Sequence, residues 1–287
     1  MTFKCAAICA RTPRGRVRHS RGQLREEVSY RTLTLEHDGH IAILTLNRPE
    51  KRNAISAEMI RELMRALDDA ERSPARVVIL TGAGTAFCAG MDLNYLKEFP
   101  SQSGEQIIED AERIAGMFRR LWSFPRPLVA AVNGPAIAGG TGLATLCDFT
   151  LAVPEARFGY TEVRIGFMPA IVSSFLVRQV GEKRAREILL SGRLFDAQEA
   201  REMGLVNEVV PPEKLLPRAR ELAAELASLS PTALAHTKRL LVRLAESELD
   251  RELKLGVEAS AAMRLTADFR EGLAAFLEKR KPVWSGK

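Results

Sequence analysis

Two glycine-containing junctions have the residue types and spacing to bind an anion through main-chain amides. The first is "GAGTAFCAGMDL" (82–93), and the second is "NGPAIAGGTG" (133–142). Each follows a short apolar run typical of a buried strand and precedes a segment expected to be helical. Amide N–H groups at such a junction point outward, and the helix dipole adds positive potential there. Two of these N–H groups converging on one point would form an oxyanion hole.

Other ligand chemistries are poorly supported by these residues. Neither junction fits the phosphate-loop pattern G-x-x-x-x-G-K-[ST], and "GAGTAF" lacks the third glycine of a dinucleotide fingerprint. The four cysteines form no CxxC pair and there are four histidines, so we expect no metal site. Taken singly, each junction is also explained by a packing turn.

Composition and charge indicate an ordinary globular protein with a basic tail. The 287 residues are 46% hydrophobic, and no apolar run is long enough to span a membrane. Residues 1–25 carry seven basic residues and no acid, leaving 35 basic against 36 acidic residues elsewhere. This balance argues against nucleic-acid binding by the body of the chain. We expect residues 1–27 to be a disordered tail and the protein to be cytoplasmic, or mitochondrial if the tail is a transit peptide.

Strands and helices alternate from residue 28, which indicates an α/β fold. A hairpin surrounds "HDGH", and Ser56 is a candidate N-cap for a helix over 57–72. Further on, we predict strands at 77–82, 127–133 and 148–153, an extended segment at 156–163, and helices at 105–122 and from 143. After Pro211-Pro212 the pattern is helical, over 213–229, 231–246 and 248–279. The domains are therefore an α/β core (28–210) and a C-terminal helical region (211–287).

Four segments occur in the order found in the crotonase, or enoyl-CoA hydratase/isomerase, family, which this sequence resembles from about residue 30 onward. They are "LNRPEKRNAIS", "AFCAGMDL", "VNGPAIAGGTGLATLCD" and "FGYTEVRIGFMP". The C-terminal "FLEKRKPVW" also resembles the ending of that family. The resemblance implies a spiral of ββα units followed by a helical trimerisation region. It also implies a homotrimer or dimer of trimers acting on an acyl-CoA thioester, with coenzyme A as part of the substrate and no other cofactor.

The resemblance assigns the oxyanion hole to the N–H groups of Met91 and Gly139. Glycine at 139 and at Gly140 would let backbone approach a thioester oxygen with no Cβ in the way. Ala89 and Leu93 flank the first donor and match the positions where the family threads pantetheine and adenine.

Two basic pairs match positions that approach coenzyme A in the family. Lys51 and Arg52 follow the first strands, and Lys279 and Arg280 stand near the C-terminus. Ammonium and guanidinium groups suit the nucleotide phosphates. A solvated surface role explains all four equally well.

The resemblance leaves the acid–base chemistry to one glutamate. The resemblance implies that a hydratase of the family uses two carboxylates. The position of the first carboxylate is Gly142 in this sequence, and the position of the second is Glu162. The apolar neighbours of Glu162 would raise its pKa toward neutrality. We predict an enoyl-CoA hydratase-type lyase. The alternatives are a Δ3-Δ2 isomerase or thioester hydrolase of the same family, and a non-catalytic CoA-thioester-binding protein.

Overall fold

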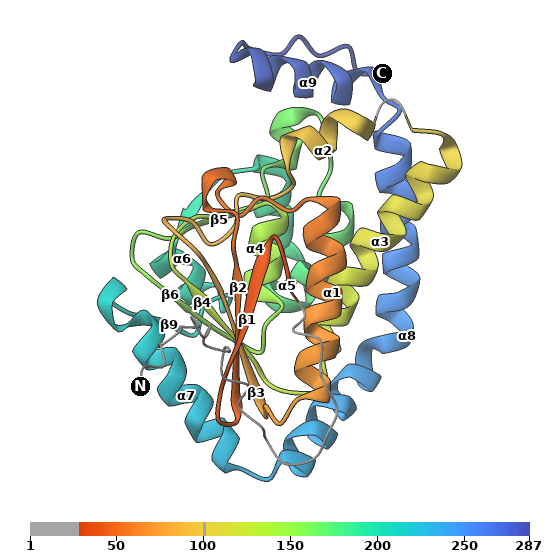
Figure 1. Cartoon of the computed structure of the whole chain (residues 1–287). Coiled ribbons are helices and arrows are strands. Elements are labelled where there is room, and N and C mark those ends of the chain that lie inside the picture. The colour runs from red at the N-terminus through yellow and green to blue at the C-terminus, as the bar shows by residue number, and fades with distance from the viewer. Residues whose placement is uncertain (1–28, 100–101) are drawn as a thin grey trace, which may run out of the picture.

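The computed structural model describes residues 29–99 and 102–287, in which strands and helices alternate along the chain (Figure 1). The predicted tail, residues 1–27, lies outside these residues. Within the described ranges, no helix is both long and apolar enough to cross a membrane.

The larger sheet contains six strands in the order β1-β2-β3-β4-β6-β9. The hairpin pair is antiparallel, and every later neighbour is parallel. All of β4 is buried, as expected for a parallel strand covered on both faces. The strands are β1 (Leu33–Asp38), β2 (Ile41–Leu46), β3 (Val77–Gly82), β4 (Leu128–Val132), β6 (Phe149–Ala152) and β9 (Glu208–Val209).

A second sheet of three short strands lies beside the site described below. Its order is β5-β7-β8, comprising β5 (Ala136–Ile137), β7 (Arg157–Gly159) and β8 (Phe195–Asp196). The parallel pair β5–β7 brings the second glycine junction next to the segment that leads to Glu162.

Helices cover the sheet as the apolar periodicity predicts. Ser56 accepts a hydrogen bond from Met59 N at 3.1 Å and begins α1 (Ala57–Arg72), which confirms the predicted helix and its cap. α1 packs on α3, and α7 packs on the larger sheet. The remaining helices of the α/β part are α2 (Leu93–Glu98), α3 (Gly104–Trp122), α4 (Gly139–Thr145), α5 (Ala170–Ser191) and α6 (Ala197–Glu202), with short 3-10 helices η1 (Pro49–Lys51) and η3 (Glu162–Ile165).

The C-terminal part is helical, as predicted, but one break is misplaced. It contains η4 (Pro212–Lys214), α7 (Leu215–Ser228), α8 (Pro231–Met263) and α9 (Ala267–Glu278). The expected interruption near 247 is absent, because no glycine or proline stands there to end the helix. The chain turns instead at Thr266, which caps α9. α8 runs along α3 and α5, and α9 lies at the end of the molecule near α2 (Figure 1). The division at residue 210 stays a prediction.

Two local expectations around the site are wrong. Helix α4 begins at Gly139 rather than at 143, so the glycines form its first turn. A Cβ on Gly140 would stand 2.2 Å from the carbonyl oxygen of Cys88, so close packing requires glycine despite its low helix propensity. The segment 156–163 is extended only through β7, and Glu162 begins η3.

Candidate active site

The two glycine junctions lie side by side in matched register. Cys88 and Ala136 form a parallel bridge, and Ile137 N donates to Cys88 O at 2.9 Å. The two segments run in the same direction, and Met91 and Gly139 each follow the bridge by three residues. The bridge therefore brings the two junctions together three residues before each predicted amide donor.

The amide of Met91 is directed away from its neighbouring chain. Ile55 N donates to Gly90 O at 2.7 Å, and Asp92 N donates to Ile55 O at 2.8 Å. In a parallel ladder the residue between these two bonds turns its own N–H to the other side. That N–H has no acceptor among the described residues, and Met91 lines a cavity.

The amide of Gly139 is equally open because Gly139 is the first residue of α4. The first bond of this helix runs from Gly142 N to Ala138 O, at 3.2 Å, so the Gly139 N–H has no partner within the helix. Ala138 has φ 52° and ψ −122°, a strained conformation for a residue with a Cβ. The bond from Ala138 N to Gly159 O, at 2.7 Å, helps to hold it. This strained residue sets the direction of the Gly139 N–H, and Gly139 lines the same cavity.

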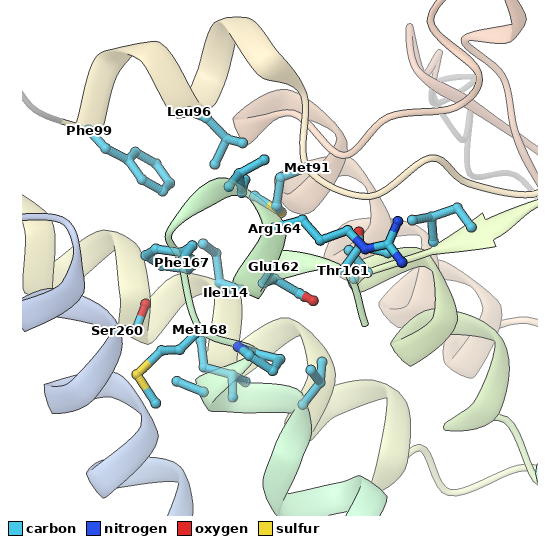
Figure 2. Close-up of a pocket in the computed structure, with 18 of the residues that line it drawn as sticks. Met91, Leu96, Phe99, Ile114, Thr161, Glu162, Arg164, Phe167, Met168 and Ser260 are labelled. Atoms are coloured by element: carbon cyan, nitrogen blue, oxygen red, sulfur yellow. The ribbon is translucent and has the colours of Figure 1, made fainter. Parts of the chain in front are cut away.

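The cavity has a volume of about 400 Å³ and mostly apolar walls. Met91, Leu96, Ile114 and Phe167 surround it, and Glu162 points into it (Figure 2). Glu162 supplies the one carboxylate among the described lining residues. A thioester bound there would meet two amide donors and one acid.

One carboxyl oxygen of Glu162 is buried without a polar partner. Its Oε2 atom is buried and makes no hydrogen bond within the described chain, although the residue as a whole is partly exposed to the cavity. Burial disfavours the charged form and raises the pKa of Glu162 to about 7. A carboxyl group with this pKa can both accept and return a proton near neutral pH.

Packing on two sides fixes the segment that carries Glu162. Thr141 Oγ1 donates to Ala136 O at 2.6 Å and accepts from Gly159 N at 3.1 Å, which links α4 to β7. On the other side, α9 packs on η3 so closely that a Cβ on Gly272 would stand 2.3 Å from the carbonyl carbon of Ile165. The C-terminal helix therefore helps to position the acid.

The structure places some predicted coenzyme A contacts at the cavity and others beside it. Ala89 and Leu93 line the cavity near Met91. Lys51 and Arg52 are exposed and do not line it, but Ala89 N donates to Arg52 O at 3.0 Å, so this pair adjoins the first junction.

The other predicted contacts are farther from the chemistry. Lys279 is exposed at the end of α9, whereas Phe276 of the same helix reaches the cavity wall. Arg280 pairs with Glu271 and Glu278, with its Nε 2.6 Å from Glu278 Oε2. Gly140 packs against Cys88 and is not among the lining residues; its part in substrate binding stays a prediction.

Four further lining residues have no signal in the sequence. Arg164 is exposed at the cavity, and its guanidinium has no hydrogen bond or ion pair among the described residues. Ser260 lies in the last turn of α8 and Arg264 directly follows that helix, about ninety residues after the segment that contains Glu162. An arginine there is typical of a solvated helix face. Phe118 of α3 looks like an ordinary core residue.

Comparisons with known proteins point to one family. Residues 36–287 match the family model described as enoyl-CoA hydratase/isomerase. A Thermus thermophilus protein named "Putative enoyl-CoA hydratase" is 49% identical over 245 residues, covering 85% of this chain and 97% of that protein. The "Short-chain-enoyl-CoA hydratase" of Clostridium acetobutylicum is 35% identical over 250 residues, covering 86% and 95%. A crystal structure of an enoyl-CoA hydratase/isomerase from Xanthobacter autotrophicus Py2 superimposes with a TM-score of 0.80 at 33% identity, covering 88% and 98%.

Proposed function

Because this chain belongs to the enoyl-CoA hydratase/isomerase family, we propose that it is an enzyme that adds water to 2-enoyl-CoA thioesters. The proposal is supported by one cavity that Met91, Gly139 and Glu162 all line, where neither amide has an acceptor among the described residues. Coenzyme A enters as part of the substrate, and the proposal requires no other cofactor.

The two amides stabilise the charge that develops on the substrate. When a nucleophile bonds to Cβ of a 2-enoyl thioester, the π electrons shift and leave negative charge on the thioester oxygen. Amide donors already directed at this oxygen need no reorganisation during the reaction, and in other enzymes one such donor contributes about 100- to 1,000-fold in rate.

Glu162 moves a proton from the attacking water to the α-carbon of the substrate. Its carboxylate takes a proton from water while the water oxygen bonds to Cβ of the substrate. The resulting carboxylic acid then donates the same proton to Cα, which discharges the enolate and restores the carboxylate. Both new bonds form on the face that Glu162 occupies, so the proposal implies syn addition.

Thr161 is available to hold the attacking water. It precedes Glu162 in the cavity wall, and its side chain makes no capping hydrogen bond to η3 (Figure 2). A hydroxyl can accept from water while the neighbouring carboxylate takes the other proton.

The position where the resemblance expects a second acid is filled by apolar packing. A Cβ on Gly142 would stand 2.9 Å from both Phe118 Cε1 and Val172 Cγ1. A glutamate at 142 would therefore overpack this wall, at a typical cost of about 1–3 kcal/mol. A second acid becomes testable only with room for it, as in a G142E/F118A double variant.

The single carboxylate also favours a second candidate, Δ3-Δ2 isomerisation. That reaction needs one base to carry a proton from the α-carbon to the γ-carbon, and Glu162 suffices for it without a positioned water. Thioester hydrolysis is the third candidate reaction.

One experiment separates these reactions. The purified protein is incubated with 2-enoyl- and 3-enoyl-CoA thioesters in ¹⁸O-labelled water, and products are identified by mass. Label gained by the intact thioester supports hydration, whereas bond migration without label or release of free coenzyme A would replace it by isomerisation or hydrolysis. No turnover together with tight thioester binding would support a non-catalytic binding protein.

We further propose that the chain assembles as a homotrimer or dimer of trimers through its C-terminal helices. Leu240, Leu241 and Leu244 of α8 are 58%, 62% and 75% exposed, an apolar group typical of an interface. Light scattering should give a multiple of three chains, and L244E should shift it toward monomer. A monomeric wild-type protein would contradict this assembly.

A further inference from the structure

A buried arginine lines the end of the cavity away from Glu162. Arg264, which follows α8, exposes none of its surface. Its Nη1 donates to Asp110 Oδ2 at 2.8 Å and to Gln102 Oε1 at 3.2 Å. Its Nε and Nη2 have no hydrogen-bond partner in the described chain. Buried polar groups are normally paired, so this half of the guanidinium lacks a partner.

The two unpaired nitrogens form one edge of the guanidinium. Nε and Nη2 direct parallel N–H bonds to the same side, which is the geometry that binds both oxygens of a carboxylate. The ring of Phe99 covers the flat face, with Cζ 3.6 Å from the ring centroid. The stacking fixes the plane of the group, and the edge is the part left to bind a ligand.

The charges around Arg264 favour an anion. Asp110 also pairs with Arg113, at 3.0 Å, and accepts a hydrogen bond from Tyr95. Burial and the bond to Asp110 raise the pKa of Tyr95, so this phenol stays neutral. The bonded group therefore contains two guanidinium ions and one carboxylate, and one further carboxylate would balance its charge.

Ser260 provides a second donor at the same end of the cavity. It precedes Arg264 by one helical turn, so the two side chains share a face. The hydroxyl lines the cavity and has no hydrogen bond to any described residue. Ser260 and Phe99 lie at the end of the cavity opposite Thr161 and Arg164 (Figure 2).

We propose that Arg264 and Ser260 bind a terminal carboxylate on the acyl chain, so that the preferred substrates are ω-carboxyacyl-CoA thioesters. The inference rests on the proposed function only in taking CoA thioesters as ligands. Because Arg264 has no exposed surface, a neighbouring side chain must turn aside as the carboxylate enters.

The test compares binding of matched saturated thioesters, which needs no turnover. Calorimetry measures succinyl-, glutaryl-, adipoyl- and suberoyl-CoA against the methyl-ended acyl-CoA of the same chain length. At one length or more, the carboxylate-ended ligand should bind about tenfold more tightly or better. R264K retains the charge beside Asp110 but loses the two parallel N–H donors, so it should abolish this preference. S260A should reduce the preference.

R113K is the matched control, because Arg113 binds the same carboxylate but does not line the cavity. It should keep the preference. An equal loss of affinity for both ligands in R264K, with their ratio unchanged, would show a structural role only. No preference at any chain length in the wild type would also overturn the proposal. Absence of hydration with the preference intact would instead refute the proposed reaction and leave the subsite standing.

Discussion

The two ends of the cavity each hold a buried polar group with unpaired atoms, but only one has a counter-ion. Glu162 has no charged partner, and burial raises its pKa to about 7. Arg264 is paired with Asp110 at 2.8 Å. Glu162 can therefore change its charge near neutral pH, whereas Arg264 keeps its charge. The first suits proton transfer, and the second suits recognition.

The largest expected effect is at the acid end. E162Q keeps the shape of the side chain but cannot accept a proton, so kcat for hydration should fall about thousandfold, within the range for a general acid–base group. Thioester binding should change little, as calorimetry would show. E155Q, on an exposed turn, is the control and should retain full turnover. Substantial turnover in E162Q would remove Glu162 from the mechanism.

At the other end, D110N should damage stability rather than chemistry. It leaves the guanidinium of Arg264 buried without its counter-ion, which typically costs about 3–5 kcal/mol. Urea unfolding measures the loss. The control D68N breaks an exposed pair with Arg120 and should cost less than about 1 kcal/mol. Equal losses of unfolding free energy in the two variants would mean that the buried pair stabilises the fold no more than the exposed pair does.

The two ends should also differ in how stability responds to pH. The folded-state pKa of Glu162, about 7, lies above its ordinary value near 4.5, so the folded state keeps a proton that the unfolded chain releases between these values. Wild-type stability should therefore fall as pH rises through this window and level off above it.

E162Q removes this dependence. Above pH 7 it should be more stable than the wild type by about 1–3 kcal/mol, the usual penalty of a buried unpaired group. Thermal unfolding of both proteins across the window gives the difference. A constant difference at all pH values would contradict the raised pKa.

The smallest expected effect is on the rate of hydration, through the water that Thr161 is proposed to hold beside Glu162. T161V removes the hydroxyl proposed to hold water, so hydration should slow about tenfold, roughly the value of one hydrogen bond. Isomerisation of a 3-enoyl thioester uses no water and should be unaffected. Equal loss of both reactions would mean that Thr161 only positions Glu162.

Sequence patterns predicted the parts of this molecule that depend on local chemistry. The cap at Ser56, the buried strands and the helical C-terminus follow from propensity and periodicity, and the resemblance supplied Met91, Gly139 and Glu162. The sequence misplaces the start of α4 because glycines disfavour helices. In the structure, the close approach of Gly140 to Cys88 requires a glycine in the first turn of this helix. Arg264 could not be predicted, since its partner Asp110 lies 154 residues earlier and nothing in the spacing connects them.

The central claim is that the amides of Met91 and Gly139 hold the thioester oxygen beside Glu162. A crystal structure of E162Q with a bound 2-enoyl-CoA tests it directly. We expect the thioester oxygen about 3 Å from both amide nitrogens, with residue 162 next to the double bond. A thioester oxygen bound elsewhere, with either amide left free, would contradict it.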